Sequence, residues 1–131
     1  MTNMKEDELC MWFNGTTLEL ADEMTKLFPK SLISTNLKDL KNLIKMYPKK
    51  LIELFVIYVL PDKEEIDNEN EKYFLENSFN KHIKDDNNLI KQMFQFKTIW
   101  KQLDDENKKT VISYMKFLCE YAQQYFMLIY S

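Results

Sequence analysis

Residues 105–130 read DENKKTVISYMKFLCEYAQQYFMLIY. Apolar side chains recur in this stretch at steps of three and four residues, which places them on one face of an α-helix. Asp104 or Asp105 stands where a helix needs an N-terminal cap. The sequence therefore predicts a long final helix that extends to Tyr130. Its inward stripe is expected to contain Val111, Tyr114, Met115, Leu118, Ala122, Tyr125, Phe126 and Ile129.

A second informative stretch is LIELFVIYVL at residues 51–60, which is apolar on nearly every helical face. A helix of that kind belongs in the centre of a bundle. Its β-branched residues also permit a buried strand, but no partner strand is evident. We expect a helix that begins at Pro48, an acceptable first helical residue, and ends at Pro61.

The rest of the chain also has helical periodicity. Asn14-Gly15 suits a helix C-terminus, and Asn36 suits an N-cap. The acidic stretch 61–72 is expected to be a solvated loop or a frayed helix start. The remaining helices are predicted at about residues 4–13, 16–28, 36–47, 73–87 and 88–103, with Ile90, Phe94, Ile99, Trp100 and Leu103 facing inward in the last of these.

Composition supports an all-α, compact single-domain helical bundle of about five to seven helices over residues 1–131. Hydrophobic residues make up 45% of the chain, which is enough for a core, and the one glycine makes β-hairpins hard to build. The basic residues are eighteen lysines with no arginine, as expected from an A/T-rich genome, so bidentate arginine contacts to guanine or phosphate are excluded. Cys10 and Cys119 are predicted to be buried free thiols, because a disulfide framework needs more cysteines.

Catalytic machinery is not recognisable in the sequence. A single glycine excludes the glycine-rich loops that bind nucleotide phosphates. His82 is the only histidine, and no second ligand stands at metal-binding spacing from it. His82 and Cys119 are the one conceivable base and nucleophile, but no local motif marks either as activated. We therefore expect no enzyme activity, no cofactor and no metal.

Charge is unevenly distributed along the chain. Residues 26–50 contain seven Lys and one Asp, whereas residues 1–25 and 61–76 are each acidic. Lys38, Lys41 and Lys45 share one helix face, and Lys49 extends the row. This lysine stripe is either the solvated face of an amphipathic helix or a contact for nucleic acid, for the protein's own acidic segment or for an acidic partner.

The final helix has an apolar face wider than one neighbour requires, because Phe117, Tyr121 and Leu128 lie to one side of its main stripe. A central helix that touches several others would explain this width. An interface with a protein partner or a second copy of the chain would explain it equally well.

Residues 94–103 read FQFKTIWKQL, and residues 111–118 read VISYMKFL after a polar turn that contains Asn-Lys. This resembles a pattern in small helical proteins of large nucleocytoplasmic DNA viruses, roughly F-K-x-I-W-x-x-L, a turn with N-K, then I-x-x-Y-x-x-x-L. Ile112 and Met115 depart from the commoner Trp-Lys-Tyr-Leu form of this pattern. The resemblance implies a viral accessory or virion protein and transfers no catalytic residue.

These observations predict a non-enzymatic protein that acts through protein-protein interaction, with a host factor or in self-assembly. The alternative is a weak, sequence-independent nucleic-acid binder that uses the lysine stripe. We expect no membrane insertion, since the longest apolar run is far shorter than the roughly 20 residues that span a bilayer. The expected location is intracellular, in the host cytoplasm or nucleus if the protein is viral, or packaged in a virion.

Overall fold

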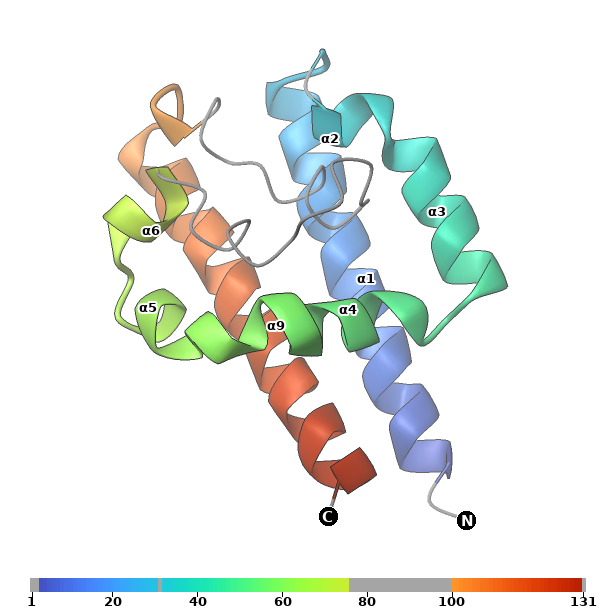
Figure 1. Cartoon of the computed structure of the whole chain (residues 1–131). Coiled ribbons are helices and arrows are strands. Elements are labelled where there is room, and N and C mark those ends of the chain that lie inside the picture. The colour runs from blue at the N-terminus through green and yellow to red at the C-terminus, as the bar shows by residue number, and fades with distance from the viewer. Residues whose placement is uncertain (1–2, 31, 76–99, 131) are drawn as a thin grey trace.

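Two long helices form the frame of the protein. The structure is a computed structural model that describes residues 3–30, 32–75 and 100–130. Helix α1 (Asn3–Leu27) packs against helix α9 (Asp105–Tyr130), and the two run in opposite directions, so both chain termini lie at one end of the molecule (Figure 1). The predicted final helix is confirmed together with its cap, because the backbone N–H of Asn107 donates to Asp104 Oδ1 at 2.8 Å.

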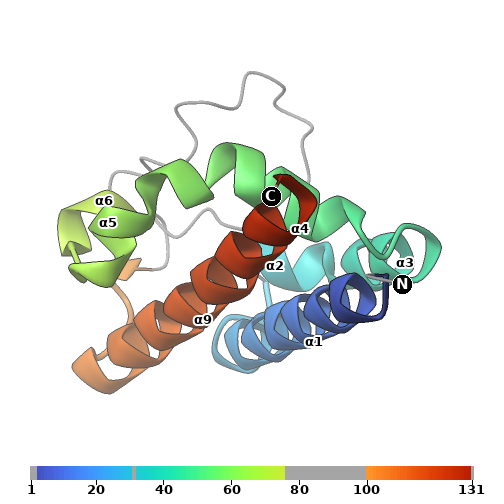
Figure 2. The ribbon, with the colours of Figure 1, turned by 90° about the horizontal axis from the view of Figure 1, so that it is seen from below.

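Helix α4 (Lys50–Tyr58) lies across both long helices on one face of the pair (Figures 1 and 2). The Phe55 ring meets Phe13 of α1 edge to face, with the ring centroids 5.1 Å apart. The Tyr125 hydroxyl of α9 donates to the Glu53 carboxylate at 3.3 Å. The helix predicted from residues 51–60 is confirmed, but it lies on the helix pair rather than in the centre of a bundle, and its Ile57 is 59% exposed.

Shorter elements flank the frame. Helices α2 (Leu32–Thr35) and α3 (Leu37–Met46) lie beside α1. The 3-10 helix η1 (Leu60–Asp62) and the helices α5 (Lys63–Asp67) and α6 (Glu71–Leu75) lie on the α9 side (Figure 2). The all-α fold is confirmed, since the described residues contain helices and turns but no strand. Over the same residues, no helix is both long and apolar enough to cross a membrane.

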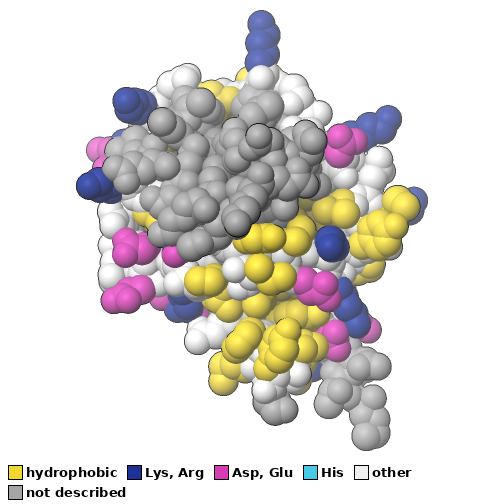
Figure 3. Space-filling view, in the orientation of Figure 1, with side chains coloured by type: hydrophobic (Ala, Val, Ile, Leu, Met, Phe, Trp, Pro, Cys, Tyr) yellow, Lys and Arg dark blue, Asp and Glu magenta, His cyan; other side chains and the backbone are white. Residues whose placement is uncertain are grey.

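The buried side chains form one hydrophobic cluster where α1, α4 and α9 meet. Trp100 and Leu103 belong to it, as predicted. Phe126 and Ile129 do not: they are 43% and 42% exposed, which corrects the predicted stripe of the final helix. The C-terminal end of α9 extends past α4 (Figure 1), and Ile129 lines a small surface cavity with Val56 and Ile57 of α4 instead of joining the core. Figure 3 shows the resulting apolar surface over α4 and the end of α9.

Helix α1 is continuous, which corrects the predicted break at Asn14-Gly15. Gly15 keeps a negative φ, so it does not act as a left-handed C-cap. The Asn14 side chain instead donates to the Pro48 carbonyl oxygen at 2.8 Å, which ties α1 to the turn before α4. Thr17 donates to the Phe13 carbonyl oxygen at 2.9 Å inside the helix rather than capping a new one. Burial of both halves of α1 against α9 and α4 outweighs the local stop signal.

Other boundaries differ from the prediction in smaller ways. Helix α3 begins after Asn36 as expected, although Asn36 does not cap it through its side chain. Helix α4 begins at Lys50, two residues after Pro48. The acidic stretch 61–72, expected as a loop or frayed start, includes η1 and α5, because buried Ile66 anchors it.

The two helices predicted over residues 73–87 and 88–103 fall mostly outside the described residues. The described part of the second includes residues 101–103, which form a turn rather than a helix.

Polar contacts attach the segment around α6 to the end of the chain that contains α9. The Trp100 indole N–H donates to Glu71 Oε1 at 2.9 Å, and Lys108 Nζ lies 2.7 Å from the same oxygen. Further along α9, Lys116 Nζ pairs with Glu69 Oε2 at 2.6 Å. Hydrogen bonds from Lys108 and Trp100 lower the pKa of the Glu71 carboxyl below its ordinary value.

Because the folded pKa of Glu71 is lowered, the contribution of this carboxylate to stability is present above its unfolded pKa and is lost as pH falls through the folded value. We expect the urea midpoint to fall on acidification below about pH 4.5, and Glu71→Gln to reduce that fall while keeping an acceptor for Trp100. NMR of the Trp100 indole N–H reports the same titration. An unchanged pH dependence in Glu71→Gln would contradict this assignment.

Gly15 occupies the middle of α1, where a glycine weakens a helix relative to alanine. A Cβ atom placed on Gly15 has no other atom within 4 Å. We therefore expect Gly15→Ala to raise the free energy of unfolding by about 0.5 to 1 kcal/mol, measured by urea denaturation. A lower stability would show that the glycine is required for a close approach of the backbone.

Candidate functional site

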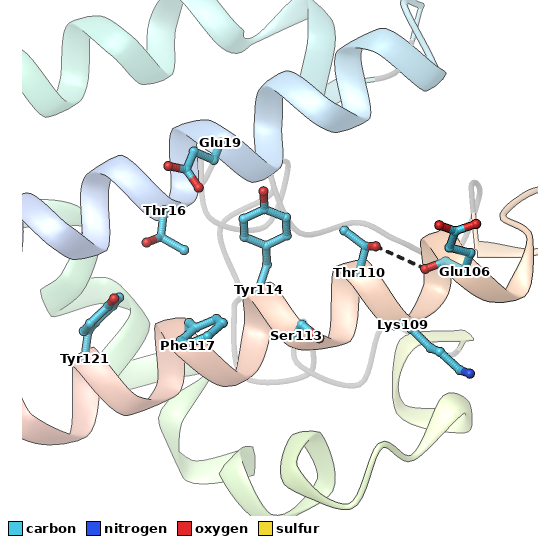
Figure 4. A pocket seen from close by; sticks show the side chains of 9 residues that line it. All are labelled: Thr16, Glu19, Glu106, Lys109, Thr110, Ser113, Tyr114, Phe117 and Tyr121. Atoms are coloured by element: carbon cyan, nitrogen blue, oxygen red, sulfur yellow. Dashed lines mark hydrogen bonds between the residues drawn. The ribbon is translucent and has the colours of Figure 1, made fainter.

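A groove of about 640 Å³ runs between α1 and α9 on a side of the pair that α4 does not cover (Figure 4). The two long helices are round in cross-section, so a furrow remains between them on the side away from α4. No described helix fills that furrow. Residues that line it include Thr16 and Glu19 from α1, and Glu106, Lys109, Tyr114, Phe117 and Tyr121 from α9.

Aromatic side chains dominate one half of this groove. Phe117 is 57% exposed, and Tyr121 is half-buried. The Tyr121 ring contacts Trp12 of α1, with the centroids 6.1 Å apart, and Trp12 is itself 40% exposed. Lys5 Nζ lies 5.2 Å from the centre of the Trp12 ring, within the range of a cation–π contact. The aromatic groove, lined by Tyr114, Phe117 and Tyr121 of α9 and bordered by Trp12 of α1 through its contact with Tyr121, is thus a partly exposed surface built from two helices.

The three residues of the predicted partner surface, Phe117, Tyr121 and Leu128, do not all lie in this groove. Phe117 and Tyr121, one turn apart on α9, line the groove together. Leu128 does not line it and packs, half-buried, against the core. Trp12 was not predicted. Its only sequence signal is a large aromatic side chain off the inward face of its helix, and the contact with Tyr121 across 109 positions of sequence has no local signature.

The groove has more carboxylates than cations along its walls. Glu19 and Glu106 line it from opposite helices, and Lys109 is the one lysine among the described lining residues. Burial raises the pKa of the Tyr114 hydroxyl, and the carboxylates Glu19 and Glu23 raise it further, since a negative field disfavours the phenolate. The aromatic groove therefore combines aromatic rings of α9 with one carboxylate from each helix.

The lysine stripe is largely as predicted. Lys38, Lys41 and Lys45 are exposed on α3, on the side away from buried Leu40, and none of them forms an ion pair within the described part of the chain. Lys49 is different, because its Nζ pairs with Glu6 Oε1 of α1 at 2.9 Å. That hydrogen bond raises the pKa of Lys49. The stripe on α3 therefore contains three unpaired cations, and Lys49 serves to attach the turn before α4 to α1.

Both cysteines are buried free thiols, as predicted. Burial, followed by the nearby carboxylates, raises the pKa of Cys10 to about 11 and that of Cys119 to about 12. Cys119 is therefore a neutral thiol near pH 7 rather than an activated nucleophile. His82 lies outside the described residues. Among residues 3–30, 32–75 and 100–130, no three His, Cys, Asp or Glu side chains are grouped closely enough to hold a metal ion.

Comparison with known protein families, with curated proteins and with solved structures finds no match for this chain.

Proposed function

We propose that this protein is a non-enzymatic interaction protein that binds a helical segment of a protein partner in the aromatic groove. The proposal rests on one observation: Phe117 and Tyr121 are partly exposed in a groove of about 640 Å³ between two long helices, and the partly exposed ring of Trp12 contacts Tyr121 beside it. Exposed aromatic residues are enriched at protein interfaces, where they contribute most of the binding free energy.

The shape of the groove favours a helix as the bound segment. Two antiparallel helices leave a furrow that a third helix can occupy with its apolar face, as in the helix-in-groove mode of recognition. Phe117 and Tyr121, one turn apart, present two anchors along the furrow. Tyr114 extends the row by one more turn toward Glu19 (Figure 4).

The charge of the groove favours a basic partner. Glu19 and Glu106 stand on its two walls, with Lys109 as the opposing cation. Complementary charge at the rim of an interface raises the association rate and selects the partner. The bound segment is thus an amphipathic helix whose polar sides carry lysine or arginine.

The resemblance of residues 94–118 to small helical proteins of large nucleocytoplasmic DNA viruses suggests where that partner is found. In that setting the protein is a viral accessory or virion-associated protein. The partner is then a host factor, another virion protein or a second copy of this chain.

The test begins with a photo-crosslinking amino acid at Phe117, introduced in cells that produce the protein, with exposed Gln123 of the same helix as the control position. We expect one defined product from Phe117 and none from Gln123. In binding measurements with the identified partner, Phe117→Ser or Tyr121→Ser should weaken affinity by roughly 10- to 30-fold, as for residues at the centre of an interface.

The matched control variant is Ile57→Ser on α4, because Ile57 is exposed to the same degree as Phe117, 59% against 57%. It removes an exposed apolar side chain outside the aromatic groove and should leave affinity unchanged. A loss of binding in Ile57→Ser with normal binding in Phe117→Ser would assign the interface to α4 and overturn the proposal.

A second candidate function is weak, sequence-independent binding of nucleic acid by the lysine stripe. The observation in its favour is that Lys38, Lys41 and Lys45 are exposed on one helix face and form no ion pair with described residues. Three lysines neutralise about three phosphates, a small footprint that gives low affinity at physiological salt. Asp39 on the same helix lowers the attraction further.

Fluorescence anisotropy with a short DNA duplex over a series of salt concentrations tests this second function. Three phosphate contacts predict a slope of about −2.7 for log affinity against log salt. Lys41→Glu should make that slope shallower by about one, because one phosphate contact is lost. Lys101→Glu, outside the stripe, should leave the slope unchanged. The triple variant Lys38/Lys41/Lys45→Glu should abolish binding. Equal slopes in all variants would exclude the stripe as the contact.

A further inference from the structure

A second groove, separate from the aromatic groove, lies where α1 faces α3 and the turn before α4. It has a volume of about 510 Å³ and is lined mainly by apolar side chains, among them Met11 and Leu18 of α1 and Ile44 of α3. A groove of this size fits within the range of small-molecule sites, which are mostly apolar and contain a few placed polar groups.

One of those polar groups is an acceptor without a partner. Asn14 lines the groove and is only 5% exposed. Its Nδ2 donates to the Pro48 carbonyl oxygen, and this contact fixes the orientation of the amide. Asn14 Oδ1 is then buried and accepts no hydrogen bond from any described residue. Because an unsatisfied buried acceptor is unfavourable, a ligand that donates a hydrogen bond to Oδ1 gains more than it would in water.

The charges around the groove favour a positively charged donor. Asp7 lines it and forms no ion pair within the described part of the chain. Lys49 also borders it, but the ammonium of Lys49 is neutralised by Glu6 at 2.9 Å. The pKa of the Cys10 thiol in the wall is raised to about 11, first by burial and then by the Glu6 carboxylate, while the Lys49 ammonium lowers it and the Asp7 carboxylate raises it by less.

We propose that this second groove is a binding site for a small apolar amine. The apolar body of the ligand occupies the space bordered by Met11, Leu18 and Ile44. Because Asn14 Oδ1 is buried in the unliganded protein, the wall of the groove opens slightly as the ammonium donates a hydrogen bond to this oxygen in the negative field of Asp7. Met11 is exposed and unbranched, so it adapts to the shape of the ligand. Gly15, also in the wall, leaves room that a bulky side chain such as leucine would fill.

The probe is 2-phenylethylamine, titrated into ¹⁵N-labelled protein and followed by amide chemical shifts. The matched ligand is 3-phenylpropionate, which has a similar apolar body and the opposite charge. For ligands of this size we expect millimolar affinity, with shifts centred on residues 7–18 and Ile44. The amine should bind about tenfold more tightly than the carboxylate, since only the amine donates to Asn14 in the field of Asp7.

Four variants locate the site. Gly15→Leu should abolish the shifts by filling the groove, whereas Gly15→Ala, the control for folding, should retain most of the binding. Asp7→Asn should reduce the preference for the amine severalfold without affecting the fold, because Asp7 is exposed. Phe117→Ser, in the aromatic groove, should leave amine binding unchanged, which separates this site from the proposed partner surface.

Absence of shifts, equal binding of the amine and the carboxylate, or normal binding by folded Gly15→Leu would each overturn the proposal. Shifts centred on Tyr121 would do so as well, because they would assign the amine to the aromatic groove.

Discussion

The packing of α1 against α9, with α4 across both, is the constraint on which the rest of the structure depends. Phe13 and Phe55 meet edge to face at that crossing, and both are fully buried. Such a contact buries large apolar surfaces, and the hydrophobic effect makes that burial the main stabilising contribution to folding. Because α4 covers one face of the helix pair and α3 and α5 flank it, no helix among the described residues covers the remaining face, and the aromatic groove is the direct result.

Polar contacts then fix the short elements to this frame. Asn14 bonds the turn at Pro48, and Glu71 receives hydrogen bonds from Trp100 and Lys108. The exposed ion pair of Glu71 with Lys108 contributes little free energy by itself, so these contacts mainly position the short elements and add modestly to stability. The contact at Asn14 has a second effect, since it leaves Oδ1 without a donor in the wall of a groove. One side chain thus holds α1 to the turn before α4 and creates the most specific polar feature of that groove.

The two grooves differ in the chemistry they offer. The aromatic groove has wide, rigid rings at its base and carboxylates at its rim, which suits an extended macromolecular surface. The groove beside α3 is smaller and is bordered by flexible aliphatic and thioether side chains around a single buried acceptor, which suits a small ligand. The two grooves share no lining residue.

Helical spacing and capping are local properties, and the sequence alone determined whatever depends on them: the all-α fold, the cap of Asp104 on α9, the exposed lysines of α3, and the inward positions of Trp100 and Leu103. Tertiary structure decided the rest. The hydrogen bond from Asn14 to Pro48 joins residues 34 positions apart. Helix α1 continues past the local stop signal at Asn14-Gly15. Exposure of Phe126 and Ile129 depends on where α4 crosses α9, and the aromatic groove depends on Trp12 meeting Tyr121. Periodicity shows which side of a helix is apolar, but only packing between distant segments determines which part of that side is covered.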